Sequence, residues 1–215
     1  MMRILLLFFL IPVCSLFAQT NRDALWNYNT GRDLERNGRM SEAETLYAAA
    51  IQITNDEISR NVATRDSYTV LTWSLLRLRR YQDVISWGER GLRLYADEFR
   101  IVETMGQAYF YLGDYDQSLR FMQRYVNSSP EGDRVPFAYF FIGEVHRLRS
   151  QFHHADIAYT TALRFQPGNS LWWYRLGLVH EALRDFPQAR AAFSRALDLN
   201  FDFPEARAAL VRSYR

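Results

Sequence analysis

Four histidines are the residues that come nearest to a metal-binding or catalytic set. His146 and His180 recur 34 residues apart, and His153 and His154 begin a predicted helix near Asp156. A metal site would need these rings to converge, but adjacent helical residues point to different sides, so only one of His153 and His154 could join it. We therefore interpret His146 and His180 as buried, hydrogen-bonded core residues and predict no metal site.

Other catalytic patterns are missing from the sequence. It contains no GxxxxGK[ST] phosphate loop, no GxSxG, no HExxH, no GxGxxG after a strand and no EF-hand loop. The acidic pairs Asp114/Asp116 and Glu42/Glu44 fall near predicted helix starts, where carboxylates favour the helix dipole. We therefore predict no catalytic residue and no cofactor, and we expect that the chain is not an enzyme.

The charge of the chain is nearly balanced. Its 26 basic residues, all of them arginine, stand against 24 acidic residues in 215. A nucleic-acid-binding protein needs a clear basic excess on one face, so we expect no nucleic-acid partner. The dense basic cluster Arg77, Arg79 and Arg80 is interpreted as a solvated turn.

The N-terminal residues have the layout of a secretory signal peptide. Arg3 precedes an apolar run from Ile4 to Val13, and a more polar end follows it. We predict a signal peptide over residues 1–18, with cleavage after Ala18 or, as an alternative, after Ser15. The chain would then be exported, to the periplasm in the first instance or else secreted. An uncleaved anchor is another alternative, and lipidation of Cys14 would give a membrane tether and an envelope lipoprotein.

The remaining sequence repeats with a period of 34 residues. Residues 137–167 align without a gap on residues 171–201, so that Gly143 falls on Gly177 and His146 on His180. Short insertions at Ile58–Thr64 and Asp133–Val135 account for the other spacings. The resulting domain, residues 24–215, has five repeats and a capping helix, at about 24–57, 65–98, 99–132, 136–169, 170–203 and 204–214.

Each repeat shows two amphipathic helical patterns. Tyr139, Ile142, Gly143 and His146 follow the i, i+3, i+4, i+7 spacing of one helix face. Gly143 would let a bulky residue of the partner helix approach the backbone. The prolines lie at predicted helix starts or repeat ends, and no segment alternates as a strand, so we predict an all-α fold.

The repeating unit resembles the tetratricopeptide repeat. Trp173, Leu176, Gly177, Ala189 and Phe193 fit the pattern of that family in the last repeat. The resemblance implies a right-handed α-solenoid whose first helices line a concave side that binds peptides or partner helices. The family's clamp for C-terminal carboxylates uses lysine, which this chain lacks.

Repeat two departs from the family pattern. Thr72 replaces the small crossing residue, and Gly88 and Gly91 stand in the second helix. Glycine inside a helix costs about 1 kcal/mol relative to alanine. Repeat two is therefore expected either to be the least stable unit or to hold an unusual close contact beside Trp87.

The resemblance implies a non-catalytic scaffold or adaptor of the cell envelope that binds another protein, through a peptide segment or a helix. An alternative is a small-ligand or lipid-binding solenoid, which a deep, closed and apolar groove would favour over an open groove rimmed by Arg and Glu. Some large residues of the inner stripe would instead pack on the neighbouring repeat. The predicted groove residues are Tyr28, Arg32, Trp73, Arg77, Arg100, Phe110, Tyr111, Phe137, Phe140, Arg147 and Tyr174.

Overall fold

The computed structural model describes residues 23–214, and the predicted signal peptide and Cys14 lie outside this range. Within it the chain forms eleven helices and no strand, which confirms the all-α solenoid prediction. Five helix pairs are followed by one capping helix. The elements are α1 (Ala24–Arg36), α2 (Met40–Ser59), α3 (Arg65–Arg77), α4 (Tyr81–Leu94), α5 (Phe99–Leu112), α6 (Tyr115–Ser128), α7 (Val135–Leu148), α8 (Phe152–Phe165), α9 (Ser170–Ala182), α10 (Phe186–Leu199) and α11 (Pro204–Arg212).

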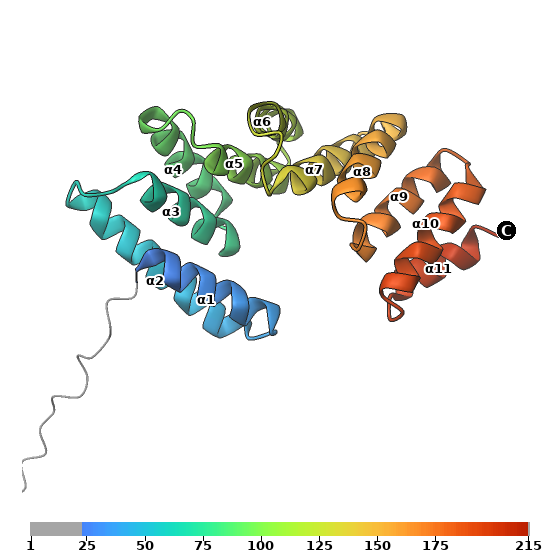
Figure 1. Ribbon diagram of the computed structural model, residues 1–215, viewed down its shortest axis with the longest axis horizontal. Coiled ribbons are helices and arrows are strands. Elements are labelled where there is room, and N and C mark those ends of the chain that lie inside the picture. The colour runs from blue at the N-terminus through green and yellow to red at the C-terminus, as the bar shows by residue number, and fades with distance from the viewer. Residues whose placement is uncertain (1–22, 215) are drawn as a thin grey trace, which may run out of the picture.

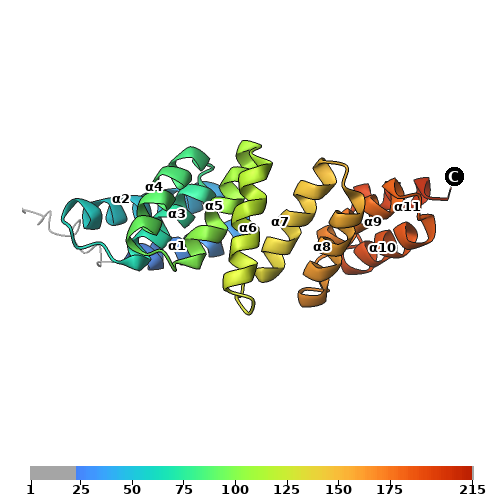
Figure 2. The same cartoon turned by 90° about the horizontal axis from the view of Figure 1, so that it is seen from above.

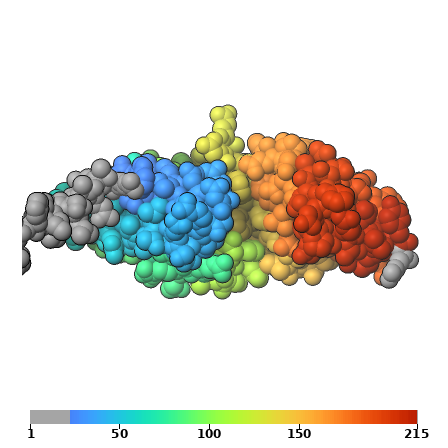
Figure 3. Space-filling model, turned by 90° about the horizontal axis from the view of Figure 1, so that it is seen from below, coloured from blue at the N-terminus to red at the C-terminus, as the bar shows by residue number. Residues whose placement is uncertain are grey.

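The helix pairs stack in chain order into an elongated arch. Figure 1 shows α4 and α6 along its outer side, with α3 and α5 beneath them, and α7 and α8 side by side. Turned by 90°, the pairs follow one another along the long axis (Figure 2). From below, the first repeat in blue and the last in red lie on either side of the green and yellow middle repeats (Figure 3). The first helices of the middle repeats therefore line the inner side of the arch.

Polar side chains and prolines begin the helices. The Asp23 carboxylate accepts a hydrogen bond from the backbone N–H of Trp26 at 2.6 Å, and Asp114 and Asp185 cap α6 and α10 in the same way. Thr64 and Ser67 form a reciprocal capping box at α3. Prolines occupy the first turn of α7, α10 and α11, where a missing N–H leaves no helical hydrogen bond unmade.

Within most pairs a glycine of the first helix faces a large residue of the second. A Cβ added to Gly143 would lie 2.8 Å from ring atoms of Tyr159, and one added to Gly177 would lie 2.5 Å from the ring of Phe193. Both rings are completely buried. The close approach expected at Gly143 is therefore confirmed.

Repeat two reverses this arrangement, because its glycines lie in the second helix. An added Cβ would lie 2.6 Å from the Met105 side chain at Gly88, and 2.9 Å from Ile101 and 3.2 Å from Tyr68 at Gly91. The glycines let α4 approach both α3 and α5. Of the two expectations for repeat two, the close contact is the one that the packing supports.

Both predicted insertions change the connections between repeats. Helix α2 continues to Ser59, beyond the predicted repeat end at residue 57, and Asn61 adopts a left-handed φ of 60° in the turn that follows. Between α6 and α7 the insertion contributes Asp133 and Arg134 to the connecting loop, while Val135 begins α7.

For residues 23–214, every helix is too short or too polar to cross a lipid bilayer.

Candidate functional site

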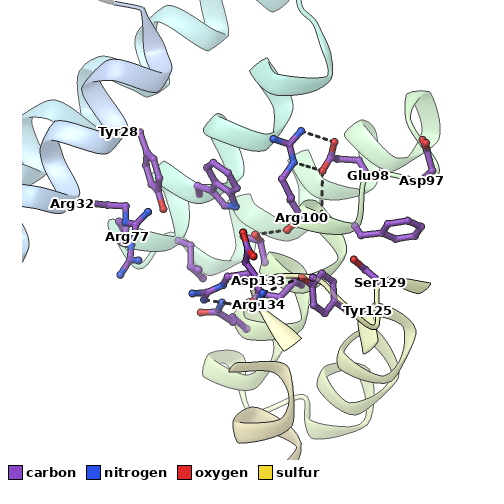
Figure 4. A pocket seen from close by; sticks show the side chains of 17 residues that line it. Tyr28, Arg32, Arg77, Asp97, Glu98, Arg100, Tyr125, Ser129, Asp133 and Arg134 are labelled. Carbon is purple, nitrogen blue, oxygen red and sulfur yellow. Dashed lines mark hydrogen bonds and ion pairs between the residues drawn. The ribbon is translucent and has the colours of Figure 1, made fainter. Parts of the chain in front are cut away.

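A cavity of about 670 Å³ opens on the inner side of the arch (Figure 4). Its walls come from α1, α3, α5 and α6, from the turn before α5, and from the loop between α6 and α7. The lining residues are Tyr28, Arg32, Trp73, Leu76, Arg77, Asp97, Glu98, Phe99, Arg100, Glu103, Thr104, Gln107, Tyr125, Ser129, Gly132, Asp133 and Arg134. Five of the eleven predicted groove residues are among them: Tyr28, Arg32, Trp73, Arg77 and Arg100.

Stacked aromatic rings form one wall of the cavity. The rings of Tyr28 and Trp73 lie 5.1 Å apart with an interplanar angle of 28°. The guanidinium of Arg32 lies 5.8 Å from the Tyr28 ring centre, and that of Arg100 lies 5.7 Å from the Trp73 ring centre. Such cation–π contacts restrict where the charged groups can move. Helices α1, α3 and α5 thus each contribute to one ordered surface.

Arg100 is held by carboxylates on two sides. Its guanidinium donates hydrogen bonds to Glu98 at 2.6 and 2.8 Å and to Asp66 of α3 at 2.7 Å (Figure 4 draws the Glu98 contacts). The Glu98 residue is only 3% exposed. Hydrogen bonding to Glu98, followed by that to Asp66, raises the pKa of Arg100 further above its ordinary value. The network ties the first turns of α3 and α5 together.

A second network joins α5 to the loop between α6 and α7. The buried Glu103 carboxylate accepts hydrogen bonds from the Gln107 amide at 2.6 Å and from Arg134 at 3.2 Å. Burial raises the pKa of Glu103, and Arg134 and Gln107 oppose that rise. The Arg134 guanidinium also lies 3.9 Å from the Phe137 ring centre. The inserted residues thereby wall one side of the cavity.

Arg77 and Arg32 have fewer carboxylate contacts than Arg100 and Arg134 do. The nearest carboxylate oxygen to Arg77 belongs to Glu35, at 3.6 Å, and Glu35 also accepts a 2.6 Å hydrogen bond from Tyr47. Burial and then that hydrogen bond raise the pKa of Tyr47. No carboxylate of the described residues lies within 4 Å of the exposed Arg32 guanidinium. Arg32 thus has no carboxylate partner among the described residues, and Arg77, which contacts Glu35 and Tyr28, keeps further N–H donors because a guanidinium has five.

The other six predicted groove residues do not line this cavity. Phe140 stacks on Trp172 of the next repeat at 5.3 Å and 14°, and the Phe137 ring meets Trp172 edge-on. Phe110 and Tyr111 pack against Phe141, and Tyr174 packs between Phe193 and Phe203. Arg147 pairs with the buried Glu144 at 3.0 Å. The rings of Phe110, Tyr111, Phe137 and Phe140 therefore pack on neighbouring repeats, whereas Arg147 pairs within α7.

Several cavity residues were not predicted from the sequence. Asp97, Glu98 and Phe99 lie in the turn and the helix start before the inner stripe, and Tyr125 belongs to a second helix. Ser129, Gly132, Asp133 and Arg134 precede α7. The only sequence signal for this last group was the insertion at Asp133–Val135, because helical periodicity does not reveal where a loop side chain points.

The interpretation of the histidines needs correction. His146 is half-buried rather than buried; its ring contacts Gln151 at 2.7 Å and stacks on His154 at 5.2 Å. His180 is also incompletely buried and lies 3.7 Å from Asp156. Both occupy the last turn of a first helix, where the partner helix no longer covers the side chain fully. The described residues contain no group of three or more His, Cys, Asp or Glu suited to a metal ion.

The three arginines of the basic cluster at the end of α3 differ in their surroundings. Arg79 and Arg80 are exposed, and Arg79 takes a left-handed φ of 57° in the turn. Arg77 instead faces the inner cavity. The interpretation of the cluster as a solvated turn therefore holds for Arg79 and Arg80 and is wrong for Arg77.

Comparison with solved structures places the fold among tetratricopeptide proteins. The chain matches a chain of the APC/C hetero-tetramer Cut9–Hcn1 with a TM-score of 0.72 and 13% identity, over 89% of this chain but only 36% of that one. A thermophilic TPR protein of Thermus thermophilus matches with a TM-score of 0.67 and 16% identity, over 89% and 98% of the two chains. The first TPR domain of Spaghetti (RPAP3), bound to the HSP90 peptide SRMEEVD, matches with a TM-score of 0.50 and 19% identity, over 54% and 90%.

Comparison at the level of sequence gives the family. No curated protein matches the chain. Two family models described as tetratricopeptide repeat match residues 104–132 and residues 170–203, which contain most of α5 and α6 and the whole of α9 and α10. These matches agree with the repeat period, the glycine-to-aromatic packing and the stacked helix pairs. The chain belongs to the tetratricopeptide repeat superfamily.

Proposed function

We propose that the inner cavity binds a peptide segment of another protein, and that the chain acts as a non-catalytic scaffold or adaptor. The observation that carries this proposal is the mixed lining of the cavity on the inner side of α1, α3 and α5. Eight of its 17 lining residues are charged, and they surround Trp73, Leu76 and Phe99. A peptide offers backbone carbonyls, N–H groups and side chains together, so it suits a surface that combines hydrogen-bond donors with aromatic rings.

The chemistry of the lining favours a peptide over a small apolar ligand. Small-molecule sites are mostly apolar concavities with few polar groups. Here four arginines and four carboxylates rim the cavity. The proposal also draws on the tetratricopeptide fold, which is in general that of protein-interaction scaffolds, and on the peptide bound to the Spaghetti domain. The likeness to that domain shows the fold alone, so its peptide does not identify the partner here.

The proposed anchors are the cavity residues that retain free binding capacity. Trp73 presents an indole ring to the cavity, while Arg32 and Arg77 present guanidinium donors. Tyr28 is only 5% exposed, and its ring stacks on that of Trp73. Aromatic and arginine side chains dominate the binding energy of protein interfaces, so these three residues are proposed to contribute most of the affinity.

The proposed place of action is the cell envelope. Support comes from the sequence of residues 1–18, with its single Arg3 and its apolar run. Removal of the segment after Ala18 would release the repeats into the periplasm, and lipidation of Cys14 would tether them to a membrane. The repeats would present the same inner cavity in either case.

The proposal is tested by selecting peptides from a displayed library on residues 19–215 and measuring affinity by fluorescence anisotropy. Replacing one anchor, in W73A or R77A, should weaken binding by about thirtyfold, which corresponds to about 2 kcal/mol. The matched control is R120A, because Arg120 is an exposed residue of the second helix α6. Melting curves must show that each variant is folded. Equal losses in R120A, or no loss in W73A and R77A, would contradict the proposed site.

A further inference from the structure

A second cavity, of about 490 Å³, lies in repeat two and shares no lining residue with the first. Its walls are the last turn of α2, the segment that follows it, the first turn of α3, and the end of α4. Asn61 and Ala63 come from the inserted residues 58–64, and Arg90 and Arg93 come from the helix that carries the unusual glycines. Two departures of repeat two from the family pattern thus meet at one place.

The polar groups of this cavity are hydrogen-bond donors without a carboxylate among them. Its lining has the guanidinium groups of Arg90 and Arg93, the phenols of Tyr68 and Tyr95, and the amide of Asn61. Among the described residues, neither guanidinium has a carboxylate oxygen within 4 Å, whereas Arg100 and Arg134 of the first cavity are both paired. The second cavity therefore carries uncompensated positive charge.

A cation–π contact restricts one of the two guanidinium groups. The Arg90 guanidinium lies 5.2 Å from the ring centre of Trp87, which leaves its N–H groups free while restricting its movement. The ring of Tyr95 is contacted at 5.4 Å by the guanidinium of Arg65, which lies outside the cavity lining and pairs with Asp97 at 3.0 Å. Arg93 lies in the last turn of α4, where a cation also complements the helix dipole. The helix dipole accounts for a cation such as Arg93 in the last turn of α4. It does not account for a cavity lined by both Arg93 and Arg90.

We propose that this cavity binds an organic oxyanion, namely a phosphate or sulfate ester group attached to an apolar or aromatic body. Guanidinium groups bind such oxyanions through paired, charge-assisted hydrogen bonds, and two of them within one helical turn match one tetrahedral group. The phenol rings, with Ile58 and Leu94, supply the apolar wall for the organic body. The volume lies in the range of small-molecule sites and exceeds what a bare inorganic ion fills.

The test is an NMR titration of residues 19–215 with phenyl phosphate, in parallel with inorganic phosphate and benzyl alcohol. Saturable shifts at the amides of Asn61 and Tyr95 are expected, with phenyl phosphate the tightest of the three probes. R90Q and R93Q should each weaken that binding by at least about tenfold, because each removes charged hydrogen bonds. R120Q, at an exposed arginine of α6, should leave it unchanged.

Three results would overturn the assignment: no saturable shift at Asn61 and Tyr95, full binding by the double variant R90Q/R93Q, or equal affinity for inorganic phosphate. Both arginines are exposed, so their replacement should leave the melting temperature unchanged, which a thermal scan checks. W73A changes the first cavity only. Its effect on peptide binding but not on phenyl phosphate binding would separate the two sites.

Discussion

The free energy of unfolding should respond differently to the loss of Glu103 and to the loss of Arg134, although the two residues pair with each other. Glu103 is 2% exposed, while the Arg134 side chain is 36% exposed, and their contact is 3.2 Å long. R134Q leaves a buried carboxylate with the Gln107 amide as its remaining hydrogen-bond partner and Arg77 as its remaining nearby cation. E103Q leaves a guanidinium that can turn toward water. We therefore expect R134Q to destabilise the chain more than E103Q does.

The magnitude follows from the burial of the pair. Removing one partner of a fully buried ion pair costs about 3–5 kcal/mol. Because Arg134 is about a third exposed and Gln107 remains, R134Q should cost about 1–3 kcal/mol. E103Q should cost less than about 1 kcal/mol, since it removes the charge that burial disfavours. The double variant should resemble E103Q, so the two effects should not add.

The destabilisation caused by R134Q should depend on pH. Burial already raises the folded-state pKa of Glu103 above its ordinary 4.5, and loss of Arg134 should raise it further. A carboxyl whose folded pKa is raised binds its proton more tightly in the folded chain, so its destabilising effect is present at high pH. The deficit of R134Q should therefore be full at pH 7 and should shrink as the pH falls through the folded pKa toward 4.5. Urea unfolding curves across this range measure it, and an E103Q deficit larger than that of R134Q would refute the reasoning.

Three further outcomes are expected. F140A should lower the free energy of unfolding in urea by about 2–4 kcal/mol, because Phe140 packs on Trp172 between repeats; a loss of binding without a loss of stability would place it in the groove instead. G91A should destabilise the chain by about 1–2 kcal/mol rather than stabilise it, because the new Cβ would meet Ile101 and Tyr68; faster hydrogen exchange over residues 81–95 should accompany the change, and a rise in melting temperature would contradict the packing. N-terminal sequencing of the exported protein should find a start near Gln19 without Cys14, whereas a lipid-modified Cys14 at the terminus would establish a tether.

The repeat architecture could be predicted from the sequence because its signals are local and recur. The 34-residue period, the glycines opposite large residues and the prolines at helix starts all act within one repeat. The same reasoning predicted Tyr28, Arg32 and Trp73 as groove residues, and all three line the inner cavity. Periodicity establishes which helix face a residue occupies, and that was sufficient for the N-terminal half of the arch.

What the sequence could not reveal depends on contacts between repeats. Phe140 lies on the expected helix face, but its ring stacks on Trp172 of the next repeat. Arg134 lies in a loop, and its reach to Glu103 depends on how repeats three and four stack. The glycines of repeat two suggested weakness, yet they allow α4 to contact Met105 and Ile101. In each case the neighbour, rather than the residue itself, determines the role.

Photo-crosslinking in the cells that produce the protein tests the proposed peptide site most directly. A photoreactive benzoylphenylalanine is placed at Leu76, which lines the inner cavity, or at Arg120, which lies on the second helix α6. The proposal predicts a discrete covalent adduct with one other protein from position 76 and none from position 120, mapped by mass spectrometry to a single peptide segment of that partner. Adducts from position 120 alone, or from neither position, would contradict the claim that the inner cavity binds a protein segment.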